Sequence, residues 1–229
     1  MATKASPDFT VGDAHSGEVE GTRFSGRRSV TVIRMRMFVA LVPPDDVTDD
    51  LSQFLAPRQE AEPGFRWTTP EQWHLTLAFM AKVADRHLDD LVARLGRAAA
   101  RRTAFPLKLA GGGAFPGPSR AKVLFAAVDA GDHQEELRRL ATGARAAATK
   151  AGAPTDGGRF HAHVTLARLG RPVEATRWLR VLDGYRSPTW QAEEIALIES
   201  HLGEGPRNRP RYEVVETFPL GRPGSTVES

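Results

Sequence analysis

Two stretches of the chain repeat the same order of apolar and polar positions. Residues 37–42 (MFVALV) form a short apolar run typical of a buried strand, and apolar residues at helical spacing follow over 47–55. Residues 123–128 (VLFAAV) form a second such run, and a second helix is expected after it, with Leu137 and Leu140 on its apolar face. The pattern predicts two copies of a strand–helix unit.

Each predicted unit is followed by nearly the same five residues. The first copy is His-Leu-Thr-Leu-Ala at 74–78, and the second is His-Val-Thr-Leu-Ala at 163–167. The separation of Phe38 from His74 nearly equals that of Phe125 from His163. Matched landmarks at matched offsets indicate an internal duplication, and two copies favour a two-lobed domain over a solenoid.

The other elements fill in around this repeat. We expect a helix at 84–103, a strand at 105–109 that runs into a turn or bulge at 111–113, a short helix at 173–182, and strands at 195–198 and 212–218 joined by a turn at 203–210. The predicted fold class is α+β. It is a two-lobed, pseudo-twofold duplicated fold, with antiparallel sheets facing a central cleft and helices on the outer faces.

The two ends of the chain lack sustained periodicity. Residues 1–33 are rich in Gly, Ser, Thr and mixed charge, and we expect a disordered N-terminal tail there. The bilobal domain is expected over 34–220, and a loose C-terminal end over 221–229.

Composition narrows the possible compartments and partners. The chain has no cysteine, which excludes disulfides and thiolate metal sites. No apolar run approaches about 18 residues and the first ten residues lack a secretory pattern, so we expect a cytoplasmic protein with no membrane partner. The net charge is +3, with arginine far commoner than lysine. Arginine suits phosphate contacts, although a biased genome composition explains the same excess.

The alternation of a strand gives each motif a polar face. Residues i and i+2 share a face, so His74 and Thr76 point one way, and His163 and Thr165 are paired in the same manner. If the two strands face one another, two imidazoles and two hydroxyls converge on one point.

This constellation suits the opening of a phosphodiester. One histidine can deprotonate an attacking water while the other protonates the leaving oxygen, and both functions are available near neutral pH. The hydroxyls of Thr76 and Thr165 can donate to the non-bridging phosphate oxygens. This scheme needs no metal and no cofactor, and it does not decide which histidine is the acid.

The motifs resemble those of the two-histidine phosphoesterase superfamily. Within it, the chain is most similar to bacterial and archaeal RNA 2′,3′-cyclic phosphodiesterases, once called 2′-5′ RNA ligases, over roughly residues 36–220. The resemblance is carried by the opening Arg36-Met-Phe-Val-Ala-Leu, Arg66-Trp67, Trp73-His74-Leu-Thr-Leu, the Ala114-Phe115-Pro116 loop and His163-Val-Thr-Leu-Ala-Arg168. One departure is Ala162, where the family often has proline.

The resemblance implies roles and a substrate class. His74 would be the proton donor and His163 the proton acceptor. The partners would be RNA ends or nucleotides that carry a 2′,3′-cyclic phosphate, and the product a 2′-phosphate. We expect a monomer that needs no cofactor.

Three further residues have two interpretations each. Phe115 can stack on a base or anchor its loop in the core. Arg168 lies three residues beyond Thr165, so a regular strand turns it away from the phosphate, and a structural salt bridge competes with substrate contact. His161 has the spacing of a strand metal pair with His163, but no third ligand is evident; we therefore expect no metal and keep His161 as a possible substrate contact.

Two alternative functions use the same residues. One is a phosphoesterase that acts on small cyclic nucleotides, and the other is a nucleotide-binding module that has lost catalysis. RNA ligation through a 2′-5′ linkage is the reverse reaction, which excess water disfavours. Intact copies of both motif histidines and both threonines favour catalysis over binding alone.

Overall fold

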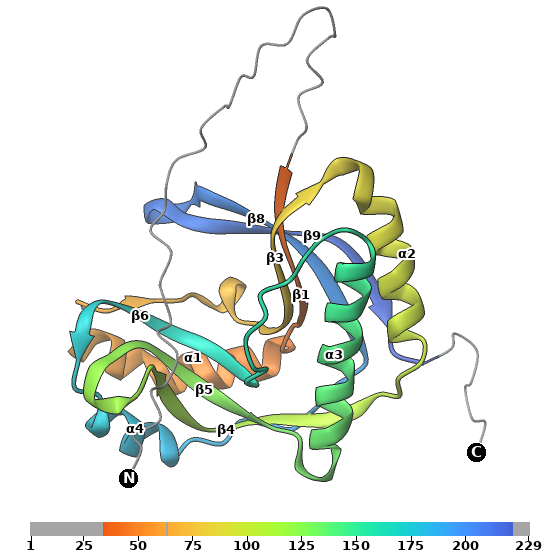
Figure 1. The fold of residues 1–229 in the computed structure, drawn as a ribbon. Coiled ribbons are helices and arrows are strands. Elements are labelled where there is room, and N and C mark those ends of the chain that lie inside the picture. The colour runs from red at the N-terminus through yellow and green to blue at the C-terminus, as the bar shows by residue number, and fades with distance from the viewer. Residues whose placement is uncertain (1–33, 63, 222–229) are drawn as a thin grey trace, which may run out of the picture. The chain divides into compact units, whose positions relative to one another are not determined.

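The computed structural model describes residues 34–62 and 64–221 (Figure 1). The predicted tail at 1–33 and almost all of the predicted C-terminal end lie outside the described residues. The strands are β1 (Arg34–Leu41), β2 (Arg66–Trp67), β3 (Leu75–Ala84), β4 (Phe105–Phe115), β5 (Ala121–Asp129), β6 (His163–Val173), β7 (Trp190–Ala192), β8 (Glu194–Gly205) and β9 (Arg209–Pro219). The α-helices are α1 (Asp45–Ala61), α2 (Leu88–Ala99), α3 (Gln134–Lys150) and α4 (Thr176–Asp183). No helix among these is long and apolar enough to cross a membrane.

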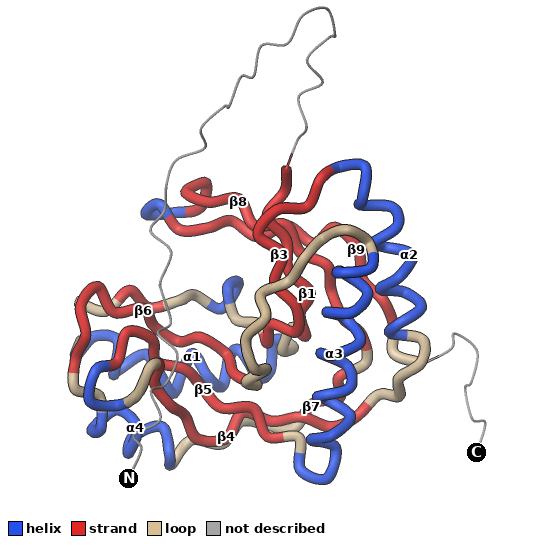
Figure 2. The backbone as a smooth tube through the Cα atoms, in the orientation of Figure 1, coloured by secondary structure: helices blue, strands red, loops and turns tan. Residues whose placement is uncertain are grey.

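The strands form a curled antiparallel sheet, which confirms the α+β class (Figure 2). Their order is β7-β4-β5-β6-β3-β1-β8-β9, and β2 pairs with β6. The two halves of the duplication meet where β3 pairs with β6 through Leu75 and Val164. They are therefore parts of one sheet rather than separate sheets.

The helices cover the outer faces, and each long helix reaches the other half (Figure 1). Helix α3 follows β5 in the chain but packs against β3. Helix α1 follows β1, yet its Phe54 ring lies 4.4 Å from the ring of Tyr185, which sits beyond α4. The Tyr185 hydroxyl also donates to Asp50 of α1 at 2.8 Å. Because α1 and α3 each contact the half of the chain that does not contain them, they hold the two halves together.

Several predicted boundaries differ from the structure. The helix expected at 84–103 spans only Leu88–Ala99, because β3 continues to Ala84 and a short 3₁₀ turn follows it. The strands expected at 195–198 and 212–218 are longer, so the connection between β8 and β9 is shorter than predicted. Strands β2 and β7 were not predicted, since two or three residues are too few to show a period.

The glycine run at 111–113 lies inside β4 as a bulge, not as a turn that ends the strand. The register of β4 against β5 shifts between Leu109 and Gly112, and Gly111 has a φ of 73°. A Cβ at Gly113 would lie 2.3 Å from the Phe125 ring. Glycine is therefore needed where β4 crosses close to β5.

The apolar face of both motif strands lies in the main core. Leu75, Leu77, Val164 and Leu166 are each at most 1% exposed. Burial of these side chains on one face directs the intervening histidines and threonines to the opposite face, as strand alternation predicts.

Candidate active site

The two motifs meet at their second residues. Leu75 pairs with Val164 in an antiparallel ladder, so the residues on either side run in opposite directions. This direction brings His74 toward Thr165 and Thr76 toward His163. Each imidazole therefore lies near the hydroxyl contributed by the other half.

All four of these side chains line one cavity of about 240 Å³. Four arginines line the same cavity, and four aromatic side chains complete much of its wall. The arginines are Arg36, Arg66, Arg168 and Arg209, and the aromatic residues are Phe38, Trp67, Phe79 and Tyr212. No aspartate or glutamate of the described chain belongs to this lining. The cavity therefore suits an anion.

Each histidine is oriented by a hydrogen bond to the backbone carbonyl two residues before it. His74 Nδ1 lies 2.8 Å from the carbonyl oxygen of Gln72, and His163 Nδ1 lies 2.8 Å from that of His161. A carbonyl oxygen only accepts, so Nδ1 carries the proton in each neutral ring. The remaining nitrogen, Nε2, is then the one that can exchange protons with a substrate.

Aromatic rings hold His74 in the cavity wall. Phe38 of β1 stacks on its imidazole with ring centroids 4.4 Å apart, and Tyr212 of β9 meets it edge-on at 5.4 Å. This packing restricts the ring and removes water from one side of it.

His163 has a similar surround, which includes two of the predicted substrate contacts. The rings of Phe115 and Phe125 lie 5.1 Å and 5.2 Å from its imidazole, and Phe115 stacks on Phe125 at 4.5 Å. The His161 ring lies 5.9 Å away. Neither Phe115 nor His161 lines the cavity, so their contacts are with His163 and direct contact with a substrate stays a prediction.

Arg168 does line the cavity, contrary to the parity of a regular strand. Thr165 pairs with Phe125, but Ala167 pairs with Leu124, so β6 has one extra residue at Leu166. Such a β-bulge shifts the alternation by one position. Arg168 therefore returns to the face of Thr165, and it forms no ion pair with any carboxylate in the described chain.

The first half contains the equivalent bulge. Thr76 pairs with Ala40 while Ala78 pairs with Val39, which leaves Leu77 as the extra residue of β3. Phe79, three residues after Thr76, consequently lines the cavity.

The ring of Phe79 also contacts the guanidinium group of Arg36. The guanidinium carbon of Arg36 lies 4.3 Å from the centre of this ring, a cation–π distance. The two halves thus present Arg36 and Arg168 to the same cavity by different routes.

The segment after β2 braces the bulge of β6. The backbone N–H of Thr68 donates to the Leu166 carbonyl at 2.8 Å, and its hydroxyl donates to the Thr165 carbonyl at 2.7 Å. Trp73 Nε1 donates to the same hydroxyl at 2.9 Å. Thr68 is therefore a positioning residue for Thr165.

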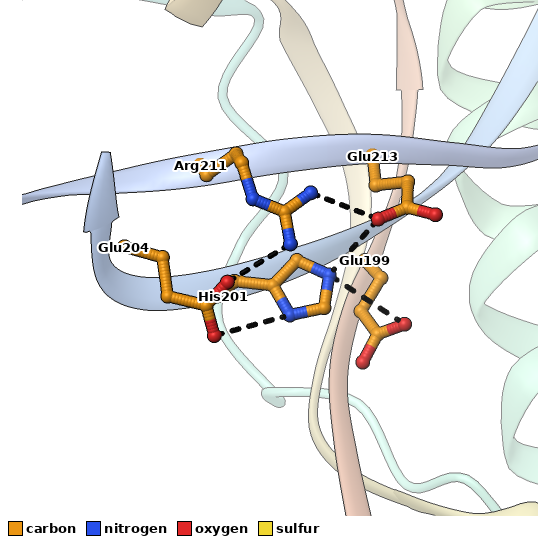
Figure 3. A network of polar contacts seen from close by, with 5 residues as sticks. All are labelled: Glu199, His201, Glu204, Arg211 and Glu213. Carbon is orange, nitrogen blue, oxygen red and sulfur yellow. Dashed lines mark hydrogen bonds and ion pairs between the residues drawn. The ribbon is translucent and has the colours of Figure 1, made fainter. Parts of the chain in front are cut away.

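The β8–β9 hairpin brings Arg209 and Tyr212 to the cavity, and a polar network holds its strands together (Figure 3). Arg211 bridges Glu204 at 2.9 Å and Glu213 at 2.8 Å. His201 lies between Glu199, Glu204 and Glu213, at 3.5 to 3.8 Å from their carboxylates. Of these pairs, Arg211–Glu204 and His201–Glu213 join the two strands, and none of these side chains lines the cavity.

Burial lowers the basicity of both histidines. The pKa of His74 falls from its ordinary 6.5 to about 4, chiefly because burial disfavours the charged ring, with His163 and Arg168 adding to the effect. The pKa of His163 is lowered mainly by burial as well, and then by His161 and Arg168. Both rings are therefore neutral at pH 7 when the cavity holds no anion.

The sequence did not single out several lining residues. Phe79 occupies the position after Thr76 that Arg168 occupies after Thr165, so the repeat itself carried a signal for it. Arg209 and Tyr212 lie far along the chain on a hairpin, where no local pattern marks them.

The His161–His163 pair offers two possible ligands for a metal ion. Within residues 34–62 and 64–221, no three side chains of His, Asp or Glu are grouped so that they could hold an ion. The pair therefore lacks a third protein ligand in that part of the chain.

Comparison with known proteins agrees with the family resemblance and the fold. The family model described as LigT like Phosphoesterase matches residues 41–125 and 128–207, which include both motifs. An RNA 2′,3′-cyclic phosphodiesterase of Thermus thermophilus is 33% identical over 194 residues, covering 81% of this chain and 90% of the relative. One of Aquifex aeolicus is 31% identical over 160 residues, covering 68% and 82%.

Solved structures give the same result. A crystal structure of a Thermus thermophilus protein has a TM-score of 0.65 at 30% identity, covering 82% of this chain and 100% of that one. The apo form of E. coli LigT has a TM-score of 0.66 at 24% identity, covering 82% and 99%. With both motifs inside the matched segments, this chain belongs to the LigT-like phosphoesterase family.

Proposed function

We propose that this chain hydrolyses 2′,3′-cyclic phosphodiester ends of RNA to 2′-phosphomonoesters, with His74 and His163 as metal-independent acid and base. The observation that carries the proposal is the single cavity lined by both histidines and both motif threonines, with four arginines and no carboxylate. The names of the Thermus and Aquifex relatives support the choice of substrate.

The reaction consists of one displacement at phosphorus. His163 Nε2 takes a proton from water as the water oxygen bonds to phosphorus. The bond from phosphorus to the 3′ oxygen breaks, and His74 Nε2 gives its proton to that oxygen. The hydroxyls of Thr76 and Thr165 donate to the non-bridging oxygens, where negative charge accumulates. The assignment of acid and base follows the family resemblance.

The proton on His74 must arrive with the substrate. Its pKa of about 4 leaves the free ring neutral at pH 7, whereas the acid role needs the imidazolium. A bound phosphate anion beside the ring favours the charged form and raises that pKa. Substrate binding and protonation of His74 are therefore coupled.

The arginines hold the phosphate while the histidines act. Arg168 lies on the cleft face with Thr165, and Arg36 is set over Phe79 on the other side. Guanidinium groups form paired hydrogen bonds with phosphate oxygens, which fixes the orientation of the reacting phosphorus.

A free cyclic mononucleotide is a second candidate substrate. The cavity of about 240 Å³ is smaller than a typical ligand pocket, so it suits one nucleotide at most. The same residues would open its cyclic phosphate by the same steps.

The test is hydrolysis of a 2′,3′-cyclic nucleotide in EDTA, with the position of the product phosphate identified. His74→Ala and His163→Ala should each lower kcat by about 10²–10⁴-fold, the usual contribution of a general acid or base. His133→Ala is the matched control, because His133 precedes α3 and does not line the cavity. Near-wild-type turnover in either motif variant contradicts the mechanism.

A further inference from the structure

A second cavity, of about 220 Å³, lies between α2 and α3. Helix α3 packs against β3, and Arg145 of α3 donates to the Leu77 carbonyl there. Leu77 belongs to the core side of β3, so this α2–α3 groove lies on the opposite face of that strand from His74. It shares no lining residue with the catalytic cavity.

The walls of the groove are basic. Its charged lining residues are Arg94, Arg97, Arg101, Arg102 and Lys150. No acidic residue of the described ranges lines it, and the rest of the lining is alanine and glycine. Because the alanine and glycine side chains are short, a ligand can approach the backbones of the two helices. The long basic side chains then lie on either side of it.

Three of the five cations lack a counter-charge among the described residues. Arg94 pairs with Asp90 at 2.8 Å, and Arg102 pairs with Glu136 at 3.4 Å. Arg97, Arg101 and Lys150 are exposed and enter no ion pair within the described chain. A basic residue near a helix C-terminus stabilises its helix, which accounts for Arg97 or Lys150 singly. It does not account for their convergence with Arg101 on one groove, where like charges repel.

Arginines in α2 and just after its end line the groove together. Arg94 and Arg97 of α2 are three residues apart and share a face of the helix, and Arg101 follows two residues after its end, so that all three line the groove. The row of guanidinium groups can therefore contact more than one phosphate of a single strand. Arginine forks bind phosphate oxygens in pairs.

We infer that the α2–α3 groove is a second RNA site, which binds the phosphate backbone of the chain whose cyclic end enters the catalytic cavity. The identity of the polymer rests on the proposed function, whereas the groove and its charge do not. Contacts of this kind are independent of sequence and sensitive to salt. The site would favour RNA chains over mononucleotides.

The binding test uses the full chain and an RNA of about 20 nucleotides with a 3′-hydroxyl end, which cannot react. Fluorescence anisotropy at several salt concentrations gives the affinity and its salt dependence. Arg97→Glu/Arg101→Glu should weaken binding by at least about tenfold and reduce the slope of log K against log salt by about 1.4, for two lost phosphate contacts. Arg177→Glu/Arg180→Glu, at exposed positions of α4, makes the same change in charge and should stay close to wild type.

Kinetics separate this inference from the proposed function. In the groove variant, KM for an RNA with a cyclic end should rise at least about tenfold relative to KM for a cyclic mononucleotide. Equal RNA affinity in the groove and control variants overturns the inference, as does groove-dependent binding of polyglutamate without binding of RNA. If the wild type opens no cyclic phosphate but still binds RNA through the groove, the proposed function fails and the backbone site stands.

Discussion

Leu75 of β3 pairs with Val164 of β6, and this pair joins the two halves of the sheet. Each is the second residue of its motif, and the ladder is antiparallel. His74 is therefore directed toward Thr165, and Thr76 toward His163. Neither half carries the full set of four side chains, because each imidazole is directed toward a hydroxyl from the other motif.

The threonine hydroxyls should matter as donors to phosphate. Thr76→Val and Thr165→Val keep the shape and strand propensity of the side chain, and each should lower kcat/KM by about 10²–10³-fold, as for other lost oxyanion donors. The pH profile should stay in place, since neither hydroxyl transfers a proton. Thr217→Val, at an exposed position of β9, is the control for the substitution itself. Unchanged activity in both motif variants would mean that these threonines only form strand.

Substrate binding should shift the pH dependence of turnover. An acid is lost as pH rises through its pKa, and the pKa of free His74 is about 4. Because kcat/KM reports the free enzyme and kcat the complex, the alkaline limb of kcat should lie at higher pH than that of kcat/KM. His74→Ala should remove this limb from both profiles. Superimposable wild-type profiles would show that the bound anion does not charge His74.

The free energy of unfolding should fall as the pH is lowered through the range in which His74 takes up a proton. The folded pKa of His74 lies below its ordinary 6.5, so the unfolded chain binds more protons between pH 6.5 and about 4. The contribution is thus fully present above pH 6.5 and is lost as pH falls toward 4, by at most about 1.4 kcal/mol per pH unit. Urea unfolding at pH 7 and pH 5 measures it. His74→Asn should flatten this dependence; an unchanged slope in that variant would assign the loss to other groups.

Arg168 should bind phosphate, and Arg171 should not. Both lie on β6, but only Arg168 lines the cavity. A lost hydrogen bond to a charged group costs about 1.5–3 kcal/mol, so Arg168→Ala should lower kcat/KM by roughly 10–150-fold, while Arg171→Ala should change it little. Arg168→Lys should recover only part of the loss, because lysine lacks the guanidinium fork. Equal effects at the two positions would remove Arg168 from the site.

The strand face on which Arg168 lies could not be predicted from the local sequence. Local pattern identified the duplicated strands, the motif histidines and the buried Leu75 and Leu77, because period and burial are written in neighbouring residues. The bulge at Leu166 depends on how β6 pairs with β5, a relation between segments far apart in the chain. One extra residue there reverses the face predicted for every later position of the strand.

Contacts between segments far apart in the chain could not be predicted either, because they too depend on how the strands are arranged in the sheet. Tyr212 reaches His74 from a hairpin near the end of the chain, and Thr68 braces the carbonyl of Thr165 from the segment after β2. Each is an ordinary polar or aromatic residue in its local context. Their roles follow from the order of strands in the sheet, which the duplication alone did not specify.

Gly113 of β4 lies against the ring of Phe125, which in turn lies beside His163. A Cβ at Gly113 would lie 2.3 Å from the ring of Phe125, which has Phe115 stacked against it and the His163 ring 5.2 Å away. The ring cannot yield without disturbing one of these neighbours. Overpacking of this kind costs about 1–3 kcal/mol of stability, and a displacement of about 1 Å at a catalytic group costs about 10²-fold in rate.

Gly113→Ala should therefore lower both the melting temperature and kcat. Gly117→Ala, in the connection that follows β4, is the matched control, because nothing lies within 4 Å of a Cβ built there and its φ of 177° is extended. Phe125→Leu in the Gly113→Ala background makes room for the added methyl group, and should restore part of the activity if the clash with Phe125 is the cause. Should Gly113→Ala match Gly117→Ala in both measurements, the close approach of β4 to β5 would have no part in holding His163.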